Sequence, residues 1–437
     1  MLVTVVPMAG HVGPISGLVA ELVHRGHDVR VYSGSQYRQR FAGLDARFVP
    51  WSAAREYDEH DLGASWPMAR HSGMRRGVAL VKEGFIGTAP GQVQDLGAEI
   101  DREPTDVLVA DPMSFGGVLT AELRALPWAM LNVLPFNQGF ESAPAGFHVK
   151  PARGALGRQR DRLLRQAYRT MTSPFHRAYN RARADVGLPR DPRPYGRALF
   201  SDWLVLATGC PGLDVPRPDL PDVVHFVGRI PPAGTSYLKP AGEEVGGEPS
   251  RPLVLVTQGT SDVDPDELLR PALLGLADRN VDVLATGGQR GRTNVGIAPP
   301  QNARVVDLVD FAAVLPKTAV TVTNGGWGGV LASLAAGVPL VVAPGGAADK
   351  PEIAARVAQF GVGVNLRRRR VKPEAVAEAV SEVLGDGAYR KRAQQIGGEL
   401  ARLGGAGAAA DLVELLAETK APVRRTDIPW ASQSSSV

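Results

Sequence analysis

The stretch from Val320 to Asp349, VTVTNGGWGGVLASLAAGVPLVVAPGGAAD, constrains the fold of this chain most strongly. Its apolar runs, residues 319–322 and 339–343, predict two buried β-strands. Between them a glycine-rich turn, residues 324–329, leads into a Leu- and Ala-rich segment, residues 330–336, which predicts a helix closed by a glycine. Strand, turn, helix and strand together predict a βαβ unit of a doubly wound domain.

The glycine-rich turn also predicts an anion site. Glycines let a ligand approach the backbone closely, and the N–H groups and dipole at a helix N-terminus favour a phosphate. The alternative interpretation is an ordinary βα turn that binds nothing.

A second βαβ unit is expected at the start of the chain. Residues 2–6 predict a strand, residues 7–14 a loop, residues 15–25 a helix and residues 29–32 the next strand. Units of this kind place ligands beyond the carboxyl ends of their strands. The loop has no G-x-G-x-x-G pattern, which argues against a nicotinamide dinucleotide site.

Composition narrows the class of protein. A chain of 437 residues with 44% hydrophobic and 22% charged residues should form two globular domains. A net charge of +4 does not suggest nucleic-acid binding, although it suits an anionic substrate. The single cysteine, Cys210, fits a reduced, cytoplasmic protein. The first residues do not resemble a signal peptide, and no apolar run is long enough to span a bilayer.

His11 and Asp111 are the candidate catalytic pair. His11 lies in the predicted loop after the first strand, where a histidine is either solvated or a general base working near neutral pH. Asp111 follows a predicted strand at residues 107–110. It either caps the helix at residues 116–123, a role that Ser114 also fits, or orients the imidazole of His11.

Proline and glycine divide the chain. Residues 230–251 are rich in both and predict an interdomain linker. The predicted domains are therefore an N-terminal domain at residues 1–229 and a C-terminal domain at residues 252–410, with a helix and tail at residues 411–437.

The sequence resembles the family 1 (UDP-glycosyltransferase-like) glycosyltransferases, especially those of actinobacterial type that glycosylate natural products. The resemblance rests on the C-terminal stretch and on the N-terminal loop, where the matching residues are Thr323, Gly325, Gly326, Gly337, Val338, Pro339 and Asp349, and Gly10, His11 and Pro14. The sequence departs from the family pattern at three positions. Asn324 replaces a phosphate-binding histidine, Lys350 replaces a frequent glutamine, and Leu308 stands where an aromatic residue is common.

The resemblance implies a GT-B fold: two Rossmann-like domains facing a central cleft, with the acceptor in the first and the nucleotide sugar in the second. It implies inverting transfer of a sugar from a dTDP- or UDP-sugar to a hydroxyl of a small hydrophobic natural product. His11 is then the base and Asp111 its partner. The implied donor residues are Gly10, Gly259, Thr260, Val309, Asn324, Gly326, Trp327, Gly328, Gly329, Asp349 and Lys350. No metal and no cofactor besides the nucleotide sugar is implied.

Two other functions stay open at this point. One is a nucleotide-sugar epimerase of the same fold, against which the pairing of His11 with Asp111 argues. The other is a non-catalytic homologue that activates a partner enzyme, which the three departures keep open. The arginine-rich residues 153–183 predict an amphipathic helix interrupted near Pro174. Its basic face is either solvated or a docking surface for an acidic partner such as a carrier protein. The oligomeric state, a homodimer included, is not indicated.

Overall fold

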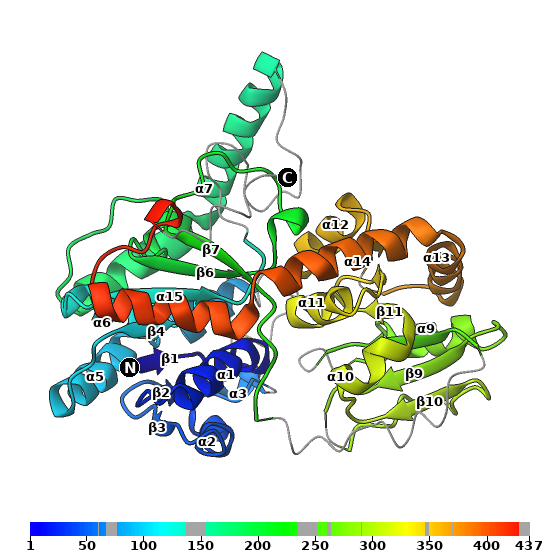
Figure 1. Ribbon diagram of the computed structural model, residues 1–437, viewed down its shortest axis with the longest axis horizontal. Helices are drawn as coiled ribbons and strands as arrows, with labels where there is room; N and C mark the ends of the chain where they lie inside the picture. The colour runs from blue at the N-terminus through cyan, green and yellow to red at the C-terminus, as the bar shows by residue number, and fades with distance from the viewer. Residues whose placement is uncertain are drawn as a thin grey trace. The chain divides into compact units, whose positions relative to one another are not determined.

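The computed structural model divides the chain into two compact units (Figure 1). It describes residues 1–59, 61–66, 77–136, 154–234, 251–259, 264–289, 291–345, 349–368 and 370–427. The first unit comprises Met1–Pro211, Val215–Gly234 and Leu403–Val437, and the second comprises Gly212–Asp214 and Thr235–Arg402. Both units are α/β with a parallel sheet, as the two βαβ patterns predict.

In the described part of the first unit, seven parallel strands form one sheet. Their spatial order is β3 (Arg47–Pro50), β2 (Arg30–Ser33), β1 (Leu2–Thr4), β4 (Leu108–Ala110), β5 (Trp128–Asn132), β6 (Leu204–Thr208) and β7 (Val224–Gly228). Val3 of β1 pairs with Val31 on one side and with Val109 on the other. The strand order reverses between β1 and β4, and this is where ligands bind in open α/β sheets.

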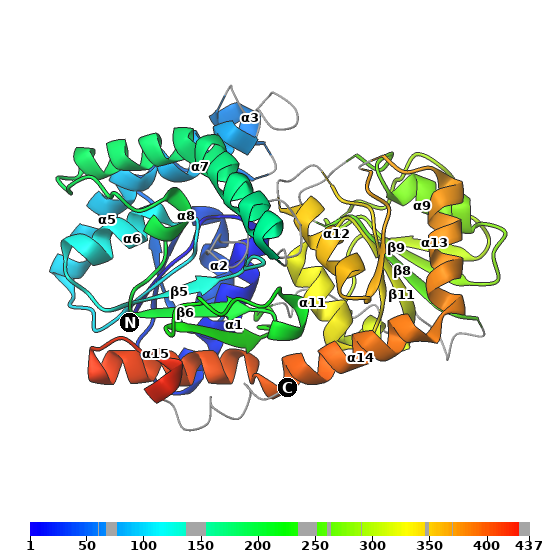
Figure 2. The same ribbon diagram turned by 90° about the horizontal axis from the view of Figure 1, so that it is seen from above.

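Helices cover both faces of this sheet (Figure 2). On one face lie α5 (Ala89–Arg102), α6 (Phe115–Leu123) and α7 (Gly154–Asp185), and on the other lie α1 (Ala9–His24) and α15 (Gly405–Thr419). Shorter helices join them, namely η1 (Ser35–Tyr37), α2 (Arg38–Ala42), α3 (Leu62–Ser65), η3 (Leu80–Ile86), α8 (Tyr195–Ala198), η4 (Pro211–Leu213) and η7 (Arg425–Asp427). Valine and leucine fill the strands, as expected for a sheet buried on both faces.

In the described part of the second unit, six parallel strands form the sheet. Their order is β10 (Ala303–Val306), β9 (Asp282–Thr286), β8 (Leu253–Thr257), β11 (Thr318–Thr323), β12 (Leu340–Val342) and β13 (Gly363–Asn365). The helices are α9 (Leu269–Leu276), α10 (Phe311–Val314), η6 (Leu315–Lys317), α11 (Trp327–Ala335), α12 (Lys350–Gln359), α13 (Pro373–Gly385) and α14 (Gly387–Arg402).

Two helices begin earlier than the sequence patterns predict. Helix α1 begins at Ala9 and not at residue 15, and α11 begins at Trp327 and not at residue 330. The glycines that indicate a turn in the sequence lie in the first turns of these two helices. Further along α1, Gly17 makes room for another segment, because a Cβ on it would lie 2.2 Å from the carbonyl oxygen of Pro231. His11 therefore lies in the first turn of a helix and not in a loop.

The C-terminal boundary differs from the predicted one. Residues 403–410, predicted to end the C-terminal domain, belong with the rest of α15 to the first unit. Leu412, Val413 and Leu416 of α15 pack into the same core as Leu18 of α1. The amphipathic pattern of α15 shows that one face is buried but does not show against which sheet.

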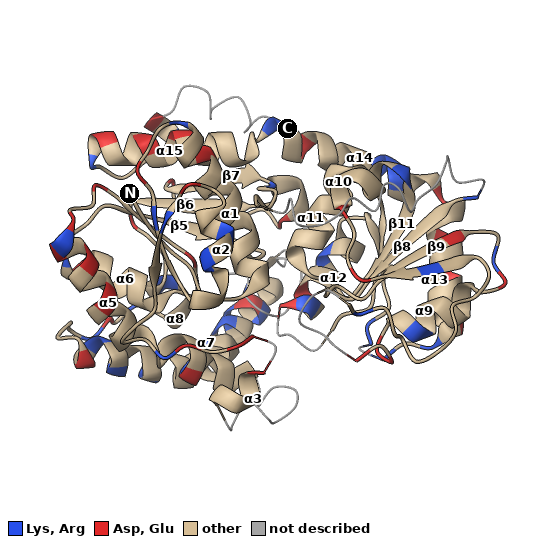
Figure 3. Ribbon diagram, turned by 90° about the horizontal axis from the view of Figure 1, so that it is seen from below, with Lys and Arg blue, Asp and Glu red and all other residues tan. Residues whose placement is uncertain are grey.

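Helix α7 is continuous through Pro174, although the sequence predicts an interruption there. Arginines follow much of its length (Figure 3). Its first half also exposes Leu156 and Leu163, which are 85% and 64% accessible. Among the described residues, no helix is both long and apolar enough to cross a bilayer.

Candidate active site

His11 and Asp111 meet at the centre of the first unit. His11 Nδ1 lies 2.7 Å from Asp111 Oδ1, and the side chains are 11% and 0% exposed. Asp111 follows β4 and His11 follows β1, so the two neighbouring strands at the reversal point deliver the pair. A carboxylate only accepts hydrogen bonds, so Nδ1 donates and Nε2 keeps a lone pair that can take a proton.

The carboxylate of Asp111 accepts two backbone hydrogen bonds besides the one from His11. The backbone N–H of Val6 donates to Oδ2 at 3.0 Å, and that of Met113 donates to Oδ1 at 3.1 Å. It therefore does not cap α6. The N-cap position of α6 is held by Ser114, whose hydroxyl instead lies 2.5 Å from the Thr4 hydroxyl. The two backbone bonds to Asp111 fix the carboxylate in place, so that it can hold the ring of His11 in one orientation.

A third side chain at this site, Glu59, is missing from the sequence prediction. Both of its oxygens accept a hydrogen bond from the backbone N–H of Ala9, at 3.0 and 2.9 Å, and Oε1 also accepts one from the Tyr37 hydroxyl. Burial and then the charge of Glu59 raise the pKa of Tyr37 well above its usual range. Fifty residues separate Ala9 from Glu59, and a contact to a backbone N–H leaves no pattern in the sequence.

Aromatic rings pack beside this group. Tyr57 lies between Trp51 and Trp66, with ring centroids 5.7 and 4.6 Å away. Burial raises the pKa of the Tyr57 hydroxyl, and the charges of Asp111 and Glu59 raise it further. The Tyr57 hydroxyl therefore remains neutral in the presence of these two carboxylates.

The predicted donor turn lies in the second unit, at the carboxyl end of β11. Asn324 is buried, and its amide Nδ2 donates to the carbonyl oxygen of Gln258, which follows the neighbouring strand β8. The backbone carbonyl oxygen of Asn324 accepts a hydrogen bond from the N–H of Gly345 at 3.0 Å. Asn324 thus ties together the loops that follow β8, β11 and β12. Gly259 lies in the same cluster with a φ of 75°, which glycine adopts without strain.

The start of α11 has open space in front of it. Gly326 occupies the N-cap position with an extended backbone and no capping side chain. A Cβ on Gly326 or on Gly328 would meet no atom within 4 Å. An α-helix leaves its first N–H groups without intrahelical acceptors, and here these belong to Trp327, Gly328 and Gly329. Room and helix dipole together suit a phosphate.

The start of α12 lies beside this turn. A Cβ on Gly325 would lie 3.5 Å from the carbonyl oxygen of Lys350 and 3.8 Å from its Cβ. The two departures from the family pattern, Asn324 and Lys350, are therefore close neighbours. Asp349 holds the N-cap position of α12, but its carboxylate makes no capping hydrogen bond.

The other predicted donor residues are Gly10, Val309 and Thr260. Gly10 lies in the first turn of α1, in the first unit. Val309 follows β10, and its side chain packs in the core of the second unit. Thr260 lies outside the described residues.

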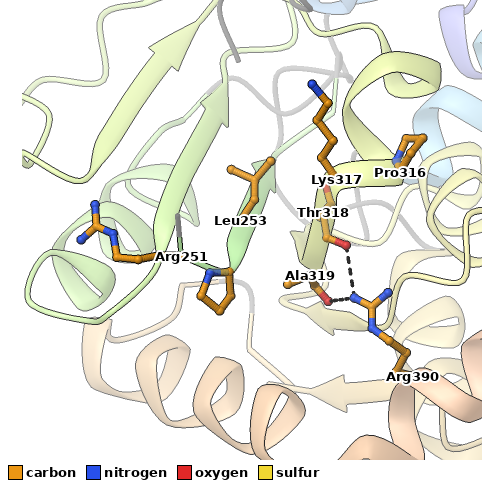
Figure 4. Close-up of a pocket in the computed structure, with 8 residues that line it drawn as sticks. Arg251, Leu253, Pro316, Lys317, Thr318, Ala319 and Arg390 are labelled. Carbon is orange, nitrogen blue, oxygen red and sulfur yellow. Dashed lines mark hydrogen bonds between the residues drawn. The ribbon is translucent and has the colours of Figure 1, made fainter. Parts of the chain in front are cut away.

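A cavity of about 400 Å³ lies elsewhere in the second unit (Figure 4). It is at the amino ends of β8 and β11, the opposite end of the sheet from the donor turn. Arg390 donates to the carbonyl oxygens of Thr318 and Ala319, at 3.2 and 2.6 Å. Its guanidinium therefore stabilises the strand end.

Known proteins share this architecture and sequence. Residues 272–415 match the C-terminal domain of the erythromycin biosynthesis protein CIII-like family. The chain is 35% identical to 4'-demethylrebeccamycin synthase of Lentzea aerocolonigenes, over 95% of this chain and 98% of that protein. The chain belongs to the family 1 glycosyltransferases. It is also 31% identical to UDP-glucosyltransferase 1 of Beauveria bassiana (strain ARSEF 2860), over 89% of each protein.

The fold agrees with this family assignment. The crystal structure of CalG4, the calicheamicin glycosyltransferase, aligns with a TM-score of 0.71 at 22% identity, covering 96% of this chain and 99% of that one. The chain has the GT-B fold, as the resemblance implied. Family 1 glycosyltransferases invert the anomeric centre and need no metal ion, so this chain is an inverting glycosyltransferase.

Proposed function

We propose that this enzyme transfers a sugar from a dTDP- or UDP-sugar to a hydroxyl group of a small hydrophobic natural product. The observation that carries the proposal is the hydrogen bond from His11 to Asp111, 2.7 Å long and shielded from solvent. The bond fixes the orientation of the ring, and in this proposal Nε2 is the nitrogen that takes the proton. A non-catalytic activator would have no need of an oriented base.

In the proposed step, Nε2 of His11 takes the proton of the acceptor hydroxyl while the oxygen attacks the anomeric carbon of the donor. The bond from that carbon to the diphosphate breaks, and the nucleoside diphosphate leaves with the electron pair. Asp111 stabilises the imidazolium that forms. The N-terminus of α11 stabilises the charge that develops on the diphosphate.

The donor assignment follows from the second unit. Gly259, Thr260, Asn324, Gly326 and the first turn of α11 surround the diphosphate in this proposal. The backbone of Val309 holds the base, and Asp349 and Lys350 contact the sugar or the phosphate. The nucleotide sugar is the only co-substrate proposed, and the location proposed is the cytoplasm, which suits a chain whose one cysteine is buried.

The test is the turnover of His11→Ala, with His24→Ala as control. His24 lies on the same helix but is exposed at its far end. Release of UDP or dTDP is measured with a panel of hydroxylated small-molecule acceptors. Loss of a general base lowers turnover about 10²- to 10⁴-fold, so His11→Ala should be nearly inactive and His24→Ala normal. Near-normal turnover of a folded His11→Ala protein would sink the base assignment.

A further inference from the structure

The helix that carries His11 lacks a local cap. Its N-cap residue is Met8, with an extended backbone and no side chain able to accept a hydrogen bond from the first turn. An uncapped N-terminus leaves backbone N–H groups without partners, and helices usually satisfy one of them with Ser, Thr, Asp or Asn at this position. The start of α1 must therefore be fixed by another part of the chain.

Glu59 supplies that missing acceptor. Its two oxygens lie 3.0 and 2.9 Å from the N–H of Ala9, the first residue of α1. Its side chain is held in turn by the Tyr37 hydroxyl, and the residue is only 6% exposed. A carboxylate at the amino end of a helix is also favoured by the helix dipole.

The loop that carries Tyr37 packs against the same turn. Gln36 Nε2 donates to the carbonyl oxygen of Pro7 at 3.2 Å. A Cβ on Gly34 would lie 2.7 Å from the Pro7 ring, so glycine is needed for this close approach. The segment between β1 and α1 is thus held in two ways. Gln36 and Gly34 contact Pro7 directly. Tyr37 holds Glu59, which in turn accepts a hydrogen bond from Ala9.

His11 follows Ala9 by two residues in the same helical turn. Its backbone N–H bonds to the carbonyl oxygen of Met8 at 2.9 Å, and its ring bonds to Asp111. Asp111 sets the rotation of the ring, whereas Glu59 sets the place of the backbone from which the ring projects. A base displaced by about 1 Å loses about 10²-fold in rate, so both constraints affect catalysis.

We propose that Glu59 is a positioning residue for His11. Its carboxylate is the distant N-terminal cap of α1 and keeps Nε2 of His11 where the acceptor hydroxyl arrives. This inference rests on the proposed role of His11 as the base. It assigns Glu59 no contact with either substrate.

The test compares Glu59→Ala and Glu59→Gln with Glu56→Ala. Glutamine keeps an amide oxygen that accepts from Ala9 N, whereas alanine removes the acceptor. Glu56 is a matched control, because it accepts from Ser35 N at 2.8 Å and from Ser35 Oγ at 2.6 Å on the same loop but is exposed. Glu59→Ala should lower kcat about 10- to 100-fold with the donor KM unchanged, whereas Glu59→Gln and Glu56→Ala should stay within about threefold of the parent.

A second readout separates positioning from simple loss of stability. The imidazole nitrogen and proton signals of His11, assigned by their loss in His11→Gln, are recorded by NMR without substrate. They should move in Glu59→Ala and not in Glu59→Gln. Unchanged signals and unchanged kcat in Glu59→Ala would overturn the inference. Equal damage in Glu59→Gln would also overturn it, because the charge and not the cap bond would then matter.

The outcomes also distinguish this inference from the proposed function. If His11→Ala turned over normally, the base assignment would fail, yet the NMR signals would still report whether Glu59 places His11. If Glu59→Ala does not fold, Glu59→Asp takes its place. Aspartate keeps the charge but withdraws the carboxylate from Ala9 by one methylene, and the same loss of kcat is expected.

Discussion

At the scale of single residues, Asn324 and Lys350 set this enzyme apart from the family pattern. Asn324 is neutral and uses its amide to tie the loops after β8 and β11 together. It therefore serves as a structural tie at a position where a histidine usually binds phosphate. Lys350 lies next to the same turn, is 9% exposed, and brings a positive charge to a site otherwise built from glycine and backbone.

We expect Lys350→Gln to raise the KM for the nucleotide sugar about 10-fold or more, because a hydrogen bond to a charged group contributes about 1.5–3 kcal/mol. The control is Lys317→Gln, at the far end of the same sheet (Figure 4). Stabilisation by UDP and dTDP, measured as a rise in melting temperature, should weaken in parallel. An unchanged KM would mean that Lys350 acts on sugar hydroxyls, where glutamine substitutes well.

The sequence alone places His11, Asp111 and the donor turn near strand ends, because each follows a short apolar run that predicts a buried strand. The sequence does not predict Glu59 as a site residue. The residues around Glu59 mix aromatic and charged types without a period, and its partner is a backbone N–H group. The tie from Asn324 to Gln258 is hidden for the same reason, since one partner is a carbonyl oxygen.

At the scale of elements, the strands predicted from short apolar runs all form, whereas two helices begin earlier than predicted. Glycine and proline near the starts of α1 and α11 indicate loops by their intrinsic preferences. In the folded chain a long-range cap at Ala9 outweighs that preference for α1. Helix α12 also makes contacts between distant parts of the sequence, because its Arg356 binds residues 213–214, which follow β6 in the chain.

Arg356 on α12 holds residues 212–214 in the second unit. Its guanidinium lies 2.7 Å from Asp214 and 3.0 Å from Glu352, and it also donates to the carbonyl oxygen of Leu213. Burial alone would lower the pKa of Arg356, but Asp214 and Glu352 outweigh it, so the group is charged at all accessible pH. All three side chains are close to nine-tenths buried.

We expect Asp214→Ala to lower the free energy of unfolding of the second unit by about 3–5 kcal/mol, because it leaves a buried cation short of its partner. The matched control is Asp222→Ala, which removes an exposed partner of Arg425 and should cost at most about 1 kcal/mol. Urea unfolding followed by circular dichroism measures both. A loss for Asp214→Ala no larger than the control's would show that Glu352 and Leu213 alone neutralise Arg356.

At the scale of the whole molecule, the chain leaves the first unit, builds the second, and returns to the first with α15 and the segment after it. Stability of the first unit therefore depends on residues far apart in sequence. His225 of β7 ties the returning segment to the sheet of the first unit, because its Nε2 donates to the carbonyl oxygen of Val423 at 2.9 Å. The residue is 5% exposed.

This tie predicts a pH dependence of stability. Burial lowers the pKa of His225, whereas in the unfolded chain a histidine titrates at about 6.5. Below about pH 6.5 the unfolded state therefore binds a proton that the folded state refuses, so stability falls as the pH falls toward the lowered folded value. The carboxyls of Glu99, Asp191 and Glu414, whose pKa values are also lowered, act in a more acidic range.

His225→Gln keeps a donor for Val423 but does not titrate. As the pH falls below about 6.5, its free energy of unfolding should therefore fall less steeply than that of the parent. His24→Gln, at an exposed position, should leave the slope unchanged. Urea unfolding at several pH values measures the three slopes. Equal slopes for the parent and His225→Gln would mean that the folded state accepts the proton at His225, and that the tie to Val423 does not depend on a neutral ring.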